Sequence, residues 1–123
     1  MAQLFARKAE IDAEALQVLA AQPHISDTVV GFHAQQAIEK SLKSVMVFNG
    51  IGEKTKHDLG RSLELLSEAG IESPPGADWL DELTAYATEF RYEDYLDAEP
   101  LDREATLALV AEVRDWAAAL TRA

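Results

Sequence analysis

Four polar residues in the second quarter of the chain are spaced so that one face of a helix can present them together. They recur at steps of three and four residues, which puts their side chains within about 80° of one another on a helix. Ammonium groups can neutralise a phosphate, an amide can read a base edge, and an imidazole can transfer protons. The stripe predicts either a site for an anionic ligand or partner, or a charged face that only contacts solvent. Its members are His33, Gln36, Lys40 and Lys43.

The charges are distributed unevenly along the sequence. The chain carries 22 acidic residues against 11 lysines and arginines, a net charge of −11. Such a balance argues against a protein that coats nucleic acid through general attraction. Residues 33–61 nevertheless have a balance of +2, and the other residues one of −13. A local anion site therefore remains compatible with an acidic protein.

The residue types exclude several other kinds of chemistry. Without cysteine there are no disulfides, thiol nucleophiles or cysteine-based zinc sites. No glycine-rich phosphate loop occurs, and the Gly-Ser and Asp-x-Asp elements of nucleotidyltransferases are missing. We expect no metal, no cofactor and no nucleotide transfer by this chain alone. The acidic residues near position 100 do not have EF-hand spacing, so they predict a solvated turn: Glu93, Asp94, Asp97, Glu99 and Asp102.

Helical periodicity and helix-capping residues predict an all-α protein with four to five helices and no strand. The chain is short enough for one domain, residues 1–123, and has no apolar run long enough to span a bilayer. It starts without a signal-peptide pattern, so we expect a cytoplasmic protein. The expected helices cover about 3–21, 26–49, 57–69, 78 through Phe90, and 102–120.

The second and last of these helices each have an apolar stripe that we expect to face the core. In the second helix this stripe lies opposite the polar one. These amphipathic faces predict an antiparallel bundle. The apolar or small positions are Val30, Ala34, Ala37, Ile38, Ser41, Leu42 and Val45 in the second helix, and Leu107, Val110, Val113 and Ala117 in the last.

Three separate segments resemble the signature of the HEPN (higher eukaryotes and prokaryotes nucleotide-binding) family, and their order and spacing cover about residues 5–120. The resemblance implies a small up-and-down helical bundle similar to the C-terminal domain of kanamycin nucleotidyltransferase, frequently a homodimer. It also implies a complex with a separately encoded minimal nucleotidyltransferase, and some such pairs are toxin–antitoxin modules. The segments are FHAQQAIEKSLK from Phe32 to Lys43, TKHDL from Thr55 to Leu59, and Tyr86 leading to Arg91-Tyr92.

The family's nucleotide-binding role maps onto residues with matching chemistry. The lysines would neutralise phosphate, the arginine would grip it with two hydrogen bonds, and the tyrosine would stack on a base. A purely structural interpretation also stands, in which Glu39 and Lys43 pair on the helix surface, His57-Asp58 caps the third helix, and Tyr92 is core or dimer surface. The implied ligand-binding residues are Gln36, Glu39, Lys40, Lys43, His57, Arg91 and Tyr92.

The ribonuclease branches of the family carry an arginine followed four to six residues later by histidine, and this chain lacks that spacing. After Arg91 the chain reads Tyr-Glu-Asp-Tyr-Leu-Asp-Ala, whose carboxylates would repel an RNA phosphate. The leading hypothesis is therefore a nucleotide- or RNA-associated binding module without catalysis of its own. The alternatives are a ribonuclease toxin using Arg91 with His57 or His33, and a helical scaffold that binds no ligand.

Overall fold

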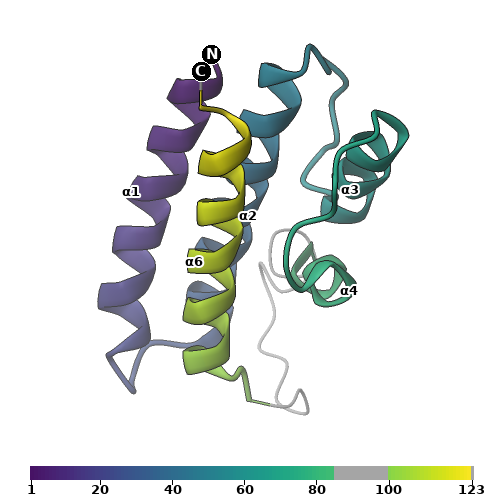
Figure 1. Ribbon diagram of the computed structural model, residues 1–123. Coiled ribbons are helices and arrows are strands. Elements are labelled where there is room, and N and C mark those ends of the chain that lie inside the picture. Colours follow the sequence, from purple (N-terminus) through teal and green to yellow (C-terminus); the bar gives the residue numbers. More distant parts are fainter. Residues whose placement is uncertain (85–99, 123) are drawn as a thin grey trace.

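The computed structural model describes residues 1–84 and 100–122. Every regular element in this part of the chain is helical, which confirms the predicted all-α bundle (Figure 1). The elements are α1 (Ala2–Ala20), α2 (Asp27–Phe48), α3 (Leu59–Glu68), α4 (Ala77–Leu80), the 3₁₀ turn η1 (Asp81–Leu83) and α6 (Arg103–Leu120).

Helix α2 lies at the centre of the bundle, with α1 and α6 beside it and with α3 and α4 on another side (Figure 1). The chain reverses between α1 and α2, so these helices are antiparallel, whereas α6 runs in the same direction as α2. The predicted apolar stripe of α2 is buried along its whole length. From α6, Val110, Val113 and Ala117 join that core, and Leu107 packs at its margin.

The helix starts follow from capping chemistry. Ser26, Asp58 and Asp102 each accept a hydrogen bond from the backbone N–H three residues later, at 3.4, 3.1 and 3.0 Å. Each cap satisfies one of the backbone donors that a helix start leaves without a partner. The predicted starts of α2 and α6 are confirmed, and α3 begins at Leu59, two residues later than predicted.

The predicted fourth helix contains a 3₁₀ turn. It begins at Ala77, but after Leu80 the chain tightens into η1. A 3₁₀ turn has three residues per turn and so keeps the buried side chains of Leu80 and Leu83 on one side. Tyr86 and Phe90, through which this helix was predicted to continue, lie outside the described residues.

Arg103, the first residue of α6, joins the starts of α2 and α6. Its guanidinium lies 3.0 Å from the carboxylate of Asp27 and donates to the backbone carbonyls of Ala20, Gln22 and Ile25. Asp27 also accepts from the backbone N–H of Leu101 at 2.9 Å. Arg103 and Asp27 thus satisfy backbone polar groups of the α1–α2 loop and of the segment that precedes α6. They hold these segments together at one end of the bundle.

None of the helices in the described ranges combines the length and the apolar character that crossing a bilayer would require.

Candidate functional site

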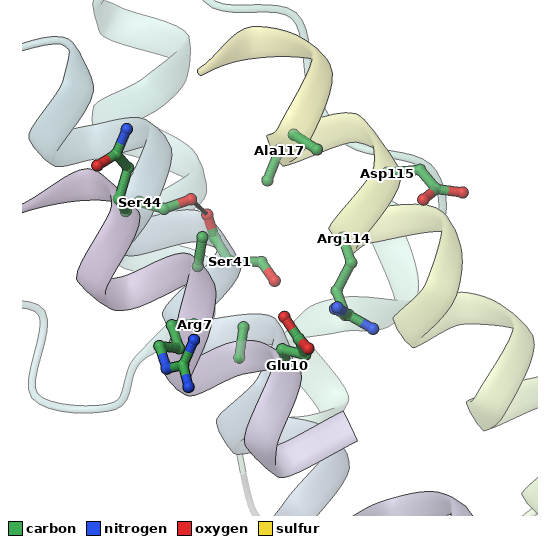
Figure 2. Close-up of a pocket in the computed structure, with 11 residues that line it drawn as sticks. Arg7, Glu10, Ser41, Ser44, Arg114, Asp115 and Ala117 are labelled. Carbon is green, nitrogen blue, oxygen red and sulfur yellow. Dashed lines mark hydrogen bonds between the residues drawn. The ribbon is translucent and has the colours of Figure 1, made fainter. Parts of the chain in front are cut away.

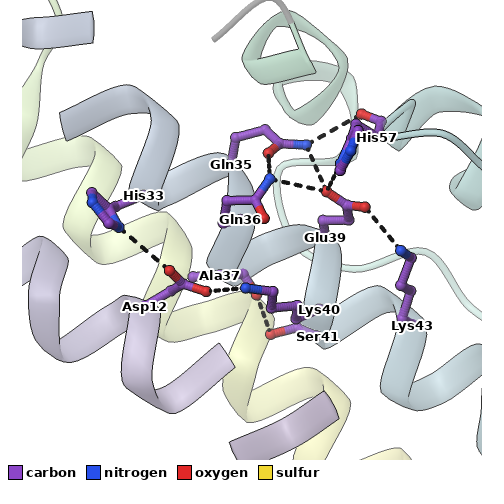
Figure 3. A network of polar contacts seen from close by, with 10 residues as sticks. All are labelled: Asp12, His33, Gln35, Gln36, Ala37, Glu39, Lys40, Ser41, Lys43 and His57. Atoms are coloured by element: carbon purple, nitrogen blue, oxygen red, sulfur yellow. Dashed lines mark hydrogen bonds and ion pairs between the residues drawn. The ribbon is translucent and has the colours of Figure 1, made fainter. Parts of the chain in front are cut away.

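The centre of the candidate site is the carboxylate of Glu39, which belongs to α2 and is only 2% exposed. Four side chains point at it (Figure 3). His57 Nδ1 lies 2.9 Å from Oε2, and Lys43 Nζ lies 3.0 Å from Oε1. The amides of Gln35 and Gln36 each donate to Oε2 at 3.2 Å. A buried charge is tolerated when it is paired and hydrogen-bonded in this way.

These contacts set the ionisation of Glu39. Burial raises the pKa of the Glu39 carboxyl, but hydrogen bonds from His57 and Lys43, together with their positive charge, outweigh burial and bring the pKa below its ordinary value. The group is therefore an anion at neutral pH. An ionised carboxylate only accepts hydrogen bonds, so His57 donates through Nδ1 and its Nε2 is left to face other partners.

His57 belongs to the loop between α2 and α3 and is held at two points. Its backbone has a φ of 68°, and that of Lys56 a φ of 50°, a left-handed conformation that costs about 1–2 kcal/mol per non-glycine residue. Gln35, which is fully buried, donates to the His57 carbonyl at 3.2 Å, and Glu39 holds the ring. Residues held in such a conformation are found at functional sites when the surrounding contacts over-determine them.

The other half of the predicted stripe faces α1. Asp12 accepts from Lys40 Nζ at 2.5 Å and lies 3.3 Å from His33 Nδ1 (Figure 3). The side chains of Lys40 and His33 are each about a quarter exposed. Residues that share one helix face thus belong to two networks. Asp12 of α1 is the partner of His33 and Lys40, whereas Glu39 of α2 itself is the partner of Gln36 and Lys43.

The structure brings together four of the predicted site residues, Gln36, Glu39, Lys43 and His57. Lys40 and His33 contact Asp12 instead, and Arg91 and Tyr92 lie outside the described residues. Asp58 caps α3, as the structural interpretation predicted, but His57 does not. Glu39 and Lys43 do form the predicted ion pair. Glu39 is buried, however, so the pair does not lie wholly on the helix surface.

Sequence reasoning missed Gln35 and Asp12. Gln35 lies at the edge of the apolar stripe of α2, and a glutamine next to an apolar run is the available signal for a buried polar contact. Besides Asp12, α1 carries two exposed acids, Glu10 and Glu14, and nothing in the sequence distinguishes Asp12 from them. Its separation of 28 residues from Lys40 is bridged only by the packing of α1 on α2.

Beside the Glu39 cluster lies a cavity of about 380 Å³, which we call the α2–α3 groove. Phe5 contributes from α1, three residues from α2, and the remaining side chains from the loop that leads to α3. Its ionisable wall is mostly cationic. The lining residues are Phe5, Lys43, Met46, Val47, Ile51, Gly52, Glu53, Lys54, Thr55, Lys56 and His57.

A second cavity, of about 430 Å³, lies between α1, α2 and α6 (Figure 2). Its two serine hydroxyls are already bonded to backbone carbonyls of α2, Ser41 to Ala37 at 2.8 Å and Ser44 to Ser41 at 2.7 Å. Its charges, which include Arg7 and Arg114, are balanced by carboxylates of the same wall. It therefore offers no surplus charge, and we place the candidate site at the Glu39 cluster and its groove.

Within residues 1–84 and 100–122, no three histidine or carboxylate side chains are grouped as a metal ion would require.

Comparisons with known proteins agree with the resemblance seen in the sequence. A model of the HEPN domain matches residues 2–120. A protein of Methanocaldococcus jannaschii named Putative toxin MJ1304 is 44% identical over 50 residues, which are 41% of this chain and 32% of that protein. The match thus spans about a third of the relative's own length. No solved structure matches the chain significantly.

Proposed function

This chain belongs to the HEPN family, and from that premise we propose that it is a binding module that holds a nucleotide or an RNA end at the Glu39 cluster. The observation that carries the proposal is the buried carboxylate of Glu39, which orients the ammonium group of Lys43 and the imidazole of His57 at the surface. Lys43 is 33% exposed and His57 is 53% exposed. Both side chains can thus reach an anionic ligand. Because the contact with Glu39 already fixes their positions, the entropy cost of binding is lower.

The proposed binding residues are those that the family resemblance implies. Lys43 neutralises phosphate and His57 donates or accepts a hydrogen bond through Nε2. Gln36, Lys40, Arg91 and Tyr92 complete the proposed ligand-binding set. Glu39 is a positioning residue in this proposal, because its oxygens are occupied by protein donors.

A titration with ATP, GTP and a short RNA at low salt tests this function. Lys43→Ala and His57→Ala should each weaken binding by about tenfold, because each removes a charge-assisted hydrogen bond worth about 1.5–3 kcal/mol. Arg122→Ala, which removes an exposed cation far along the chain, is the matched control and should change affinity less than twofold. Equal effects from all three variants would indicate general electrostatic attraction and contradict the proposal.

We further propose that the module works in a complex with a minimal nucleotidyltransferase, the partner that membership of the HEPN family implies. Co-expression with the product of a neighbouring gene of that type, followed by affinity purification and size-exclusion chromatography, should give one stable complex. Separate elution of the two proteins at micromolar concentration would contradict this part of the proposal.

The proposed homodimer has a candidate surface on α1. Leu4, Ile11 and Val18 are 46%, 58% and 66% exposed and recur at the seven-residue spacing of a helix–helix seam. Two copies of α1 packed antiparallel about Ile11 would set Lys8 opposite the partner's Glu14. Ile11→Arg should convert such a dimer to monomer in analytical ultracentrifugation, whereas an unchanged sedimentation coefficient would exclude this face.

A second candidate function, a ribonuclease toxin, is favoured by the contact between Glu39 and His57. A carboxylate that holds Nδ1 leaves Nε2 to transfer a proton, which is the usual arrangement of a histidine base. The relative from Methanocaldococcus jannaschii bears a toxin name. This function predicts growth arrest on expression, relieved by Arg91→Ala and by His57→Ala. Normal growth with intact cellular RNA would exclude it.

A further inference from the structure

We propose that the α2–α3 groove is a subsite for a terminal phosphate monoester, carried by a single nucleotide or by an RNA end, and bound by Lys43, Lys54 and Lys56 and by the hydroxyl of Thr55. This inference rests on the proposed function, since it names the place and the chemical class of the ligand that the HEPN module would bind. The family resemblance does not imply a ligand-binding role for four residues of the groove, namely Phe5, Lys54, Thr55 and Lys56.

The first argument is charge. Three lysines and His57 line the groove, and its one acidic residue, Glu53, lies 3.1 Å from the guanidinium of Arg61. Of these groups, Lys43 and His57 already contact Glu39. Lys54 and Lys56 have no carboxylate partner among the described residues, although the chain carries a net charge of −11. In a protein with so many acidic side chains, cations gathered without local partners favour an anionic ligand.

The second, independent argument is Thr55. Its side chain lies in the groove wall, is 4% exposed, and its Oγ1 has no hydrogen-bond partner among the described residues. A buried hydroxyl without a partner costs about 1–3 kcal/mol, so such groups call for an explanation. A phosphate oxygen in the groove would accept the missing hydrogen bond.

The third argument concerns the remainder of the ligand. Met46 and Val47 of α2 and Ile51 of the loop supply apolar surface, and Phe5 adds an aromatic ring whose centroid lies 6.0 Å from Lys43 Nζ. A ribose and base attached to the phosphate would bury this surface, which free phosphate would leave exposed. A volume of about 380 Å³ lies near the lower end of the range of about 300–1,000 Å³ for small-molecule pockets and fits one nucleotide.

The test is calorimetric titration of the full-length protein with AMP, adenosine, inorganic phosphate, and a short RNA with or without a terminal phosphate. AMP or the phosphorylated RNA should bind at least tenfold more tightly than adenosine, inorganic phosphate or the unphosphorylated RNA. The preference between AMP and the phosphorylated RNA end identifies the source of the phosphate monoester.

Two variants examine the groove itself. Lys54→Ala combined with Lys56→Ala should weaken binding at least tenfold, whereas Arg114→Ala combined with Arg122→Ala removes the same charge elsewhere and should change it less than twofold. Thr55→Val should weaken binding without lowering the midpoint of thermal unfolding, because it removes an unsatisfied hydroxyl at nearly constant volume. A hydroxyl with a purely structural role would show the opposite pattern.

The outcomes separate this inference from the function on which it rests. If binding persists in the lysine double variant and in Thr55→Val but is lost in His57→Ala, the groove is not the phosphate subsite. The proposed binding function at the Glu39 cluster would still stand. Absence of binding to any nucleotide or RNA overturns both. Equal affinity for AMP and adenosine overturns the assignment of the groove to a phosphate.

Discussion

The buried carboxylate of Glu39 and the exposed ring of His57 are joined by a 2.9 Å contact between Oε2 and Nδ1. This contact links the central helix to the loop before α3 and sets the orientation of the imidazole. Both the binding function and the alternative catalytic one depend on it.

Replacing Glu39 should destabilise the fold. Glu39→Gln puts an amide where four donors converge, so part of the network must lose its acceptor. Leaving buried groups unpaired lowers the free energy of unfolding by about 2–4 kcal/mol, measurable by urea denaturation at neutral pH. Glu68→Gln changes an exposed acid on α3 and should alter stability by no more than about 0.5 kcal/mol. Similar values for the two variants would contradict the structural role of Glu39.

The same carboxylate should make stability depend on pH in the acid range. The pKa of Glu39 in the folded protein lies below its ordinary value of 4.5, so the unfolded chain binds the proton more readily. The stabilisation is therefore complete above the unfolded pKa and is lost as pH falls through the folded one. The free energy of unfolding should fall between about pH 5 and pH 3 more steeply in the wild type than in Glu39→Gln. Parallel curves would count against the assignment.

Gln35 should act on His57 without touching a ligand. Gln35→Leu keeps the side-chain volume but removes the donor to the His57 carbonyl, so the strained loop loses one of its two anchors. We expect a loss of about 1–3 kcal/mol in stability and new chemical shifts for the His57 ring in two-dimensional NMR. Gln17→Leu, an exposed position on α1, should leave the ring shifts unchanged. If the His57 ring shifts are unchanged in Gln35→Leu, the loop keeps its conformation without the hydrogen bond from Gln35.

Arg103 should matter for stability and leave ligand binding alone. Arg103→Ala removes the pair with Asp27 and the donors to three backbone carbonyls, so the thermal unfolding midpoint should fall, with a cost of about 2 kcal/mol or more. Because this contact lies at the start of α2 and the Glu39 cluster three turns further on, nucleotide affinity of the folded variant should be retained. Arg122→Ala serves as the control for lost charge, and an equal midpoint in the two variants would refute the role of Arg103.

Gly76 should tolerate alanine poorly. Its φ is 67°, and an added Cβ would lie 2.6 Å from Cδ1 of the buried Leu109. Gly50 has a φ of 74° but open space around its Cβ position, so it isolates the backbone cost of about 1–2 kcal/mol. Gly76→Ala should be more destabilising than Gly50→Ala in chemical denaturation, and the difference reports the clash with Leu109. Equal losses would mean that Leu109 moves aside freely.

Much of the fold could be predicted from local sequence patterns. Caps at Ser26, Asp58 and Asp102 act on donors three residues away, and the apolar stripes of α2 and α6 repeat within a few turns. Such signals need no knowledge of distant packing. The 3₁₀ turn after Leu80 was less predictable, because it reflects how Leu80 and Leu83 meet the core.

The candidate site was predictable in its residue types and not in its partnerships. Spacing on one helix brought out His33, Gln36, Lys40 and Lys43 as a common face, and the family resemblance added Glu39 and His57. Which of these residues contact one another depends on α1 and the α2–α3 loop, whose positions relative to α2 are set by burial of the apolar core. Hence Asp12 draws Lys40 and His33 toward α1, while Glu39 gathers Lys43 and His57. A helical period specifies the direction of a side chain, whereas the partner it meets there comes from chain segments that are distant in sequence and adjacent only after folding.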